Sequence, residues 1–217
     1  MQLYSSELAP SPLKVLVFIA EKGIKDIEIV NLDLGKLEHK TPEYKAIAPN
    51  SRVPALKLDD GTIILETTAI CRYLESLYPE PNLFGQSPLE IASIEMWYSR
   101  ITYELATPLA HGFRHTHPHM SQMEDQNNEF GLAQRQIGVK ALEIYNEIIA
   151  TRAFIAGDNF SYADIQMAIN LKFLVRLNRL DIENYKNLNE YISQVYSRPS
   201  FSINLKFLVR LNRPPGL

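Results

Sequence analysis

The stretch "SRVPALKLDDGTIILETTAI", residues 51–70, decides the fold of the first third of the chain. Apolar runs on both sides of Asp60-Gly61 predict a hairpin, because an Asp-Gly pair favours a primed two-residue turn. A helix is expected to begin at "ETTAI", directly after the hairpin. Pro54 cannot donate to a strand ladder, so it belongs at a strand entrance or a tight turn. We interpret Val53-Pro54 as a candidate cis peptide, with a trans proline in a loop as the alternative.

The elements before this stretch alternate in type. Leu3 and Tyr4 are expected to end a short strand, and residues 13–21 carry a helical pattern that stops at Gly23. "DIEIVNLDL" predicts a second strand and "TPEYKAIA" a short helix. The order β-α-β-α-β-β-α indicates an α/β domain with a mixed sheet flanked by helices.

The segment "PEPNLFGQSP" has three prolines, one glycine and no periodicity, as is typical of an interdomain linker. We therefore predict one domain over residues 1–79, a linker over 80–88 and a second domain over 89–217. Helical patterns at about 88–115, 130–150, 161–178 and 184–197 make the second domain all-helical. "SYAD" at 161–164 predicts a capping box in which Asp164 has a structural role.

The segment "INLKFLVRLNR" occurs at 169–179 and again at 203–213. Two copies do not indicate a solenoid, which needs at least three units. We interpret the second copy as a local duplication, native or introduced, and expect it to form a poorly anchored helix or arm that is dispensable.

Composition excludes several classes of protein. The 217 residues contain one cysteine, a formal net charge of −3 and no apolar run as long as a membrane span, and the first ten residues lack the pattern of a signal peptide. A single cysteine cannot form an intrachain disulfide, and the dispersed basic residues argue against a nucleic-acid surface. We expect a cytoplasmic protein without nucleic-acid or membrane partners.

The stretch around residues 53–67 also predicts a ligand site. A cis peptide before Pro54 would present the N–H and C=O of Val53 to the backbone of a bound peptide. A helix that starts after Leu65 offers unpaired N–H groups to a carboxylate. Thr67 adds a hydroxyl group, and Glu66 can pair with an amine. These features describe a small peptide ligand with a free amino-acid head.

Taken together, the element order, Val53-Pro54, Glu66-Thr67, the linker near residue 80 and the capping box at 161 resemble the cytosolic glutathione transferase superfamily. "APSPLKVLVFIAEKGI" and "HKTPEYKAIAPNSRVPAL" are similar to its bacterial and phi- or theta-like branches. The resemblance implies a thioredoxin-like domain, an all-α domain, a homodimer and glutathione as co-substrate, without a metal. It implies the glutathione-binding residues Val53, Pro54, Glu66, Thr67, His39, Lys40 and Arg52.

The chain departs from the family where relatives place a catalytic Ser or Cys, because that position is Ala9. A free thiol has a pKa near 8.5, so another group must stabilise the thiolate of glutathione. The available hydroxyl groups are those of Ser11, Ser6 and Ser5, and we expect Ser11 to be the donor. The alternative is that Ser11 caps the first helix.

Other residues are expected to have structural roles. Cys71 is interpreted as a buried thiol, and "HTHPH" at 115–119 as a solvated loop rather than a metal site. Core packing is favoured for Trp97 itself. Trp97, Tyr98 and Ile101 together exceed what one core face needs, which favours a symmetric dimer through their helix. Tyr103 and Phe113 are the candidates for the electrophile pocket.

The sequence therefore predicts an enzyme that conjugates the glutathione thiolate to small, apolar electrophiles in detoxification. The alternatives are a glutathione-dependent peroxidase or reductase and a non-catalytic adaptor that keeps the fold.

Overall fold

The computed structural model describes residues 1–6 and 9–204, which divide into two compact units. Of the described residues, the first unit contains Met1–Leu83 together with Pro199–Asn204, and the second contains Phe84–Arg198. Residues 199–204 thus group with the first unit, whereas the sequence prediction placed them in the helical domain. They form a 3-10 helix in which Ser200 Oγ donates to Glu21 Oε1 at 2.5 Å. The prediction for the duplicated tail falls on residues 205–217, outside the described residues.

The first unit has the predicted order of elements and is thioredoxin-like. The strands form a sheet in the order β2-β1-β3-β4; β1 pairs parallel with β2 and antiparallel with β3, and β3 pairs antiparallel with β4. Leu3 lies opposite Ile29 on one side and Leu56 on the other. The elements are β1 (Gln2–Ser5), α1 (Pro10–Glu21), β2 (Glu28–Asn31), the 3-10 helix η1 (Glu38–Lys40), α2 (Pro42–Lys45), β3 (Ala55–Lys57), β4 (Ile63–Leu65) and α3 (Thr67–Leu77).

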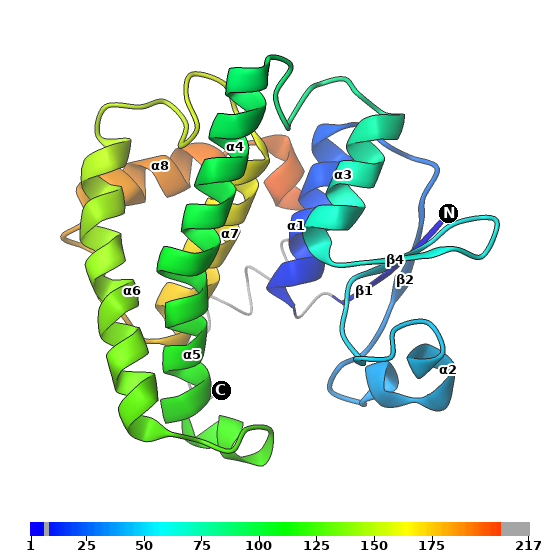
Figure 1. The fold of residues 1–217 in the computed structure, drawn as a ribbon, viewed down its shortest axis with the longest axis horizontal. Helices are drawn as coiled ribbons and strands as arrows, with labels where there is room; N and C mark the ends of the chain where they lie inside the picture. The colour runs from blue at the N-terminus through cyan, green and yellow to red at the C-terminus, as the bar shows by residue number, and fades with distance from the viewer. Residues whose placement is uncertain (7–8, 205–217) are drawn as a thin grey trace. The chain divides into compact units, whose positions relative to one another are not determined.

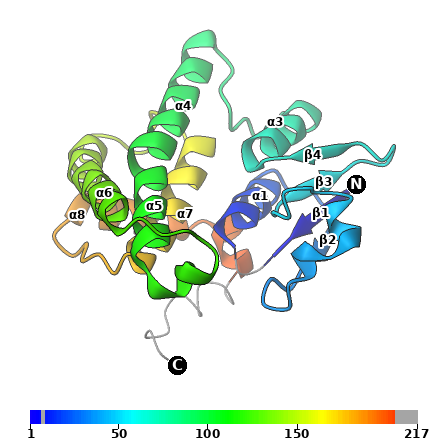
Figure 2. The same ribbon diagram turned by 60° about the horizontal axis from the view of Figure 1, so that its bottom comes forward.

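Side chains of β1 alternate between the two faces of this sheet. Leu3 and Ser5 are fully buried on one face, and Tyr4 packs on Tyr44 of α2 with ring centroids 5.7 Å apart. Figures 1 and 2 both show α1 and α3 side by side. Lys14 of α1 is almost completely buried, and burial lowers the pKa of its ammonium group to about 8, an effect that the nearby Cys71 of α3 partly opposes.

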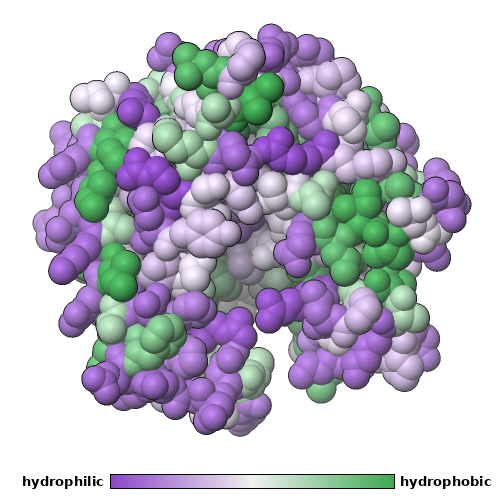
Figure 3. All heavy atoms as spheres, viewed as in Figure 1, coloured by the Kyte–Doolittle hydropathy of each residue, from purple (hydrophilic) through white to green (hydrophobic). Residues whose placement is uncertain are grey.

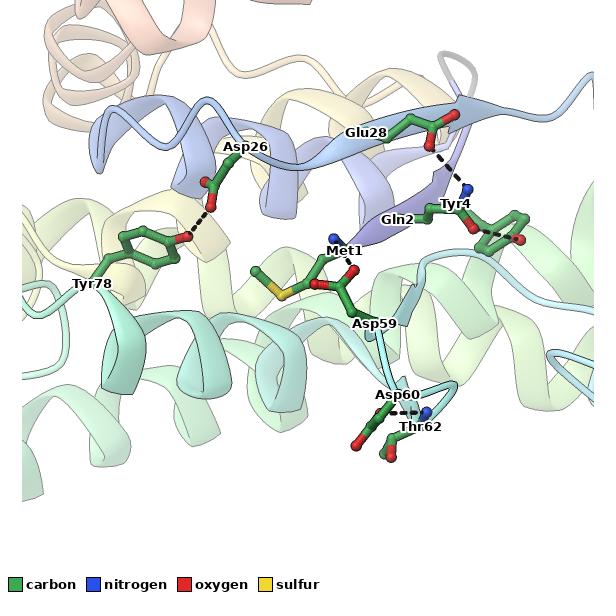
Figure 4. Close-up of polar contacts among 9 residues, drawn as sticks. All are labelled: Met1, Gln2, Tyr4, Asp26, Glu28, Asp59, Asp60, Thr62 and Tyr78. Atoms are coloured by element: carbon green, nitrogen blue, oxygen red, sulfur yellow. Dashed lines mark hydrogen bonds and ion pairs between the residues drawn. The ribbon is translucent and has the colours of Figure 1, made fainter.

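The β3–β4 turn differs from the predicted primed turn. Such a turn needs positive φ at both central residues, but only Gly61 has it, with φ 89°. Leu58 N–H instead donates to Thr62 O at 2.9 Å, which closes a three-residue loop. Figure 4 shows Asp60 accepting from Thr62 N at 2.8 Å and Asp59 pairing with the amino terminus of Met1. The side chain of Asp60 stabilises this loop by accepting from the backbone two residues later, as is typical of aspartate in turns.

Lys22, at the end of α1, holds the segment that follows α3. Its side chain is 0% exposed, and Nζ lies 2.5 Å from a Glu75 carboxylate oxygen. Nζ also donates to the carbonyl oxygens of Pro79 and Pro81, and Leu83 N–H donates to Glu75. These bonds tie residues 79–83, which the sequence placed in or beside the linker, to the first unit.

The second unit is all-helical, as predicted, among the residues that the structure describes. The expected helix over 88–115 is interrupted by a π-helical segment, Ile101–Ala106. Pro108 explains this interruption, because it has no N–H to donate within a regular helix. Ser87 and Glu90 form a capping box at the start of the unit. Its helices are α4 (Pro88–Arg100), α5 (Thr107–Thr116), the 3-10 helix η3 (Pro118–Gln122), α6 (Asn128–Ile149), α7 (Tyr162–Leu177) and α8 (Lys186–Tyr196).

The predicted capping box of α7 is confirmed. The buried carboxylate of Asp164 accepts hydrogen bonds from Ile155 N, from Ser161 N and Oγ, and from Tyr191 Oη, at 2.7–2.8 Å. Nearly every residue in the first three turns of α7 is buried, as expected of a helix at the centre of a bundle. Asp164 therefore links the start of the central helix to α8 and to the loop before α7.

The helices α5 and α6 pack closely through glycines, and Figure 1 shows them side by side. A Cβ atom added at Gly138 would lie 2.5 Å from Leu109 Cγ, and one at Gly112 would lie 2.9 Å from Arg135 Cβ. Real side chains do not approach so closely, so the separation of these helices depends on glycine at both positions.

Trp97 and Ile101 are core residues, as expected for Trp97, whereas the sequence suggested Ile101 for a dimer interface. They are 3% and 0% exposed, and the guanidinium groups of Arg100 and Arg152 lie 4.7 and 4.9 Å from the Trp97 ring. Helical periodicity therefore predicted too narrow a core face for α4 and the π-helical segment, because it left Ile101 outside that face. None of the helices in residues 1–6 and 9–204 is long and apolar enough to cross a membrane. Figure 3 shows exposed apolar groups along α6.

Candidate functional site

A small cavity in the first unit brings together most of the residues predicted to bind the peptide. Its volume is about 100 Å³. Arg52, Val53 and Pro54 reach it from the segment before β3, Glu66 and Thr67 from the start of α3, and Ser11 from the first turn of α1. Two further lining residues were not predicted, Asn50 and Leu65.

The backbone at Val53 matches the geometry expected from the sequence. The Val53-Pro54 peptide is cis, as predicted. Among the described residues, no hydrogen bond uses the N–H or C=O group of Val53, whereas the neighbouring Arg52 carbonyl accepts from Tyr44 Oη at 2.7 Å. Val53 therefore keeps one donor and one acceptor at the wall of the cavity.

The start of α3 forms a second wall. β4 ends at Leu65, and Glu66 precedes the helix with φ 69° and ψ 130°, outside the favoured regions for a residue with a side chain. Such strained backbone concentrates at ligand sites, where the surrounding structure maintains it. The first N–H groups of α3 and the Thr67 hydroxyl lie at this end of the helix, where the helix dipole favours an anion.

The three candidate serines occupy different environments. Ser11 lines the cavity, whereas Ser5 and Ser6 are 0% and 1% exposed and do not. The alternative that Ser11 caps α1 is wrong, because the cap is Ala9 and the helix begins at Pro10. Proline favours the first helical position, which places Ser11 inside the first turn. Its hydroxyl is therefore not used as the helix cap.

His39 and Lys40 lie on η1 and do not line this cavity. His39 Nδ1 is buried and has no hydrogen-bond partner within the described part of the chain. Burial, and then the charge of Lys40, lower the pKa of His39.

Asn50 lines the cavity but was not predicted from the sequence. Its side chain accepts from Arg52 N at 3.2 Å, and the next residue, Ser51, has a φ of 55°. The "NSR" sequence could have indicated this side-chain turn.

A larger cavity, about 440 Å³, lies in the second unit. Phe113 lines it, whereas Tyr103 is 73% exposed and does not. His117 also lines it, and His115 Nδ1 accepts from Asn127 N at 3.1 Å.

In residues 1–6 and 9–204, no three His, Cys, Asp or Glu side chains are placed to hold a metal ion. Cys71, expected to be a buried thiol, is buried and forms no disulfide.

Comparisons with known proteins identify the family. Residues 10–77 match the glutathione S-transferase N-terminal domain, and residues 109–199 match the C-terminal domain. Glutathione S-transferase 2 of Saccharomyces cerevisiae is 34% identical over 203 residues, covering 92% of this chain and 87% of that protein. Glutathione S-transferase F12 of Arabidopsis thaliana is 28% identical over 215 residues, covering 93% and 95%. The crystal structure of Gtt2 from Saccharomyces cerevisiae has a TM-score of 0.84 at 34% identity and covers 94% of this chain and 100% of that one.

The fold and these similarities define a glutathione-dependent enzyme with a thioredoxin-like domain and an all-helical domain. The chain belongs to the glutathione transferase family, whose members use glutathione as a substrate.

Proposed function

We propose that this enzyme conjugates the thiolate of glutathione, bound in the cavity of the first unit, to small electrophiles as a detoxification reaction in the cytoplasm. The observation that carries this proposal is the convergence of three wall elements on one cavity: the unpaired backbone of Val53, the start of α3 with Glu66 and Thr67, and Ser11. They complement the cysteinyl backbone, the γ-glutamyl head and the sulfur of glutathione, respectively. Arg52 lines the same cavity, and His39 and Lys40 are proposed to interact with the glycyl carboxylate.

Activation of the thiol requires a group that prefers its ionised form. Lowering a thiol pKa by two units requires about 2.7 kcal/mol. A helix N-terminus contributes about 0.3–1 kcal/mol at exposed sites, so a hydroxyl donor must supply much of the remainder. Ser11 is proposed to be that donor, because it lines the cavity and does not cap α1.

Calorimetric titration with glutathione tests the binding site. Glu66 is exposed, so replacing it with alanine is expected to remove about 1 kcal/mol, or roughly a fivefold to tenfold loss in affinity. Glu43→Ala, which removes an exposed carboxylate of α2 outside the cavity, serves as the matched control and should bind like the parent. Equal affinities of the two variants would remove Glu66 from the site.

Turnover separates the reaction from its two alternatives. Conjugation of 1-chloro-2,4-dinitrobenzene above the uncatalysed rate is expected. Reduction of cumene hydroperoxide without conjugation would identify a peroxidase instead. Absence of both glutathione binding and turnover would support an adaptor, the reading that Ala9 favours.

A symmetric homodimer is proposed as the working form. Leu89, Met96 and Tyr103, seven residues apart along α4 and the π segment, are 80%, 47% and 73% exposed. A second copy of the chain would cover this apolar surface. Light scattering should give about twice the monomer mass, and Met96→Asp should shift it towards the monomer. A parent protein that scatters as a 24.8 kDa species would contradict the dimer.

A further inference from the structure

Lys14 of α1 carries a buried ammonium group that the proposed reaction leaves unused. The residue is 8% exposed. Within the described part of the chain it forms no ion pair and no side-chain hydrogen bond, and the titratable group that acts on it is the thiol of Cys71. A buried cation without a carboxylate partner is costly for the fold. Such groups concentrate at functional sites, so a role for Lys14 in the reaction is worth testing.

The positions of Lys14 and Cys71 place this ammonium group beside the small cavity of the first unit. Ser11 and Thr67, from the first turns of α1 and α3, both line that cavity, so both helices begin there. Lys14 follows Ser11 by three residues and therefore lies one turn further along the same face of α1. Cys71 follows Thr67 by four residues and has the same relation to it on α3. Figures 1 and 2 show the two helices side by side, so Lys14 and Cys71 meet about one turn beneath the cavity lining.

The direction of the side chain brings the charge of Lys14 closer to the cavity. A helical side chain leans towards the amino end of its helix, and for Lys14 that is the end at the cavity. One turn of about 5.4 Å plus a contact distance puts the ammonium group within about 10 Å of a sulfur atom bound beside Ser11. At an effective dielectric constant of about 20, a full charge at that distance lowers a thiol pKa by about one unit. This effect adds to that of the two helix starts.

We propose that Lys14 is a positioning residue for the reaction, whose ammonium group stabilises the thiolate of bound glutathione through its field and without touching the sulfur. In this step the S–H bond of glutathione ionises and its proton leaves to the solvent. The inference rests on the proposed function, because it takes the cavity beside Ser11 as the site of the glutathione sulfur. It supplies part of the stabilisation that Ala9, at the usual place of a Ser or Cys, cannot provide.

Titration of the bound thiol tests the charge of Lys14 directly. The ultraviolet absorbance of the thiolate, with S-methylglutathione as the baseline without a thiol, gives the apparent pKa of bound glutathione. Lys14→Met nearly keeps the length of the side chain and removes its charge, so it should raise this pKa by about one unit. Lys14→Arg keeps the charge and should leave the pKa near that of the parent. An unchanged pKa in Lys14→Met would overturn the proposal.

Lys25→Met is the matched control, because it removes one exposed positive charge from the segment after α1. Solvent screens such a charge, so the pKa of bound glutathione should change by less than about 0.3 units. A rise in Lys25→Met equal to that in Lys14→Met would also overturn the proposal, since any lysine would then have the same effect.

Stability separates this role from a merely structural one. If Lys14 served the fold, Lys14→Met would unfold at a lower urea concentration than the parent. Because the substitution removes a buried charge, we expect the variant to unfold at a higher urea concentration although its bound thiol is harder to ionise. Lower stability of Lys14→Met together with an unchanged thiol pKa would identify a structural residue.

A measurement on the parent protein does not depend on how a variant folds. If the charge of Lys14 stabilises the thiolate, the thiolate must raise the pKa of Lys14 by the same amount. Nuclear magnetic resonance of the protein labelled at lysine Cε follows this pKa, with the Lys14 signal assigned by its absence in Lys14→Arg. Saturating glutathione should raise the pKa by about one unit from about 8, and S-methylglutathione should not. Identical titrations with the two ligands would overturn the proposal.

Calorimetric titration distinguishes failure of this inference from failure of the proposed function. Lys14→Met should weaken glutathione binding about threefold at pH 7 and leave S-methylglutathione binding unchanged, because only glutathione can ionise at sulfur. Equal effects on both ligands, or none on either, would overturn the inference and leave the proposed function standing. Absence of binding of both ligands to the parent would contradict the proposed function and this inference with it.

Discussion

Replacing Asp164 with alanine should strongly destabilise the second unit. The substitution removes one acceptor from four hydrogen bonds of 2.7–2.8 Å and leaves Ile155 N, Ser161 N and Tyr191 Oη buried without it. Each buried unpaired donor costs about 1–3 kcal/mol, so the three donors together cost about 3–9 kcal/mol. Burial raises the pKa of Asp164, which shows that desolvation of the carboxylate is itself unfavourable and offsets part of this loss. The expected net loss is about 3–5 kcal/mol, the range for breaking a buried charged network.

Urea unfolding followed by tryptophan fluorescence measures this loss. Trp97 is the only tryptophan and lies buried in the second unit, so its emission reports on that unit. Asp158→Ala, at an exposed position in the loop before α7, is the control and should change stability by less than about 0.5 kcal/mol. If the two variants unfold at the same urea concentration with equal slopes, the four hydrogen bonds contribute nothing net and the reasoning fails.

Three further changes have expected outcomes. Lys14→Met should stabilise the protein by up to about 3 kcal/mol at pH 7, because burial lowers the pKa of Lys14 from 10.5 to about 8. Between pH 8 and 10.5 the unfolded chain binds more protons than the folded one, so the parent should gain stability as the pH rises through that range. Urea unfolding at several pH values should show this gain in the parent and not in the variant. Lys22→Met should cost about 3 kcal/mol and expose residues 79–83 to limited proteolysis, unlike Lys25→Met at an exposed position; equal cleavage would contradict the role of Lys22. Ser11→Ala should raise the apparent thiol pKa of bound glutathione by about one unit in single-turnover pH profiles, and an unchanged profile would leave only backbone N–H groups to activate the thiol.

The fold was predictable because each helix and strand of the first unit, and the start of α7, has a recognisable local sequence pattern. Strand and helix periodicity gave the order of the first unit, and the "SYAD" signature gave the start of α7. The failures have physical causes. The β3–β4 turn closes between Leu58 and Thr62 because Asp60 does not adopt the positive φ that a primed turn needs, and Ile101 is fully buried although helical periodicity placed it outside the core face.

The candidate site was predictable only where its residues are close in sequence. Val53, Pro54, Glu66 and Thr67 flank one hairpin, so their convergence follows from local structure. Ser5 is fully buried, which strand alternation with the buried Leu3 could have indicated. The basic lining of the larger cavity could not be predicted, because Phe113, Arg135 and Arg179 meet only through helix packing.

The close glycine contact between α5 and α6 has a consequence for how this enzyme can be altered. Gly112 and Gly138 set the spacing of the two helices, and these helices contribute Phe113 and Arg135 to the lining of the larger cavity. A side chain at either glycine would force the two helices apart and thereby change the shape of the cavity. Substitution of Phe113 or Arg135 changes only what the walls offer. Substitutions at Phe113 and Arg135 can therefore change which ligands the cavity prefers, while Gly112 and Gly138 keep the spacing of α5 and α6 unchanged.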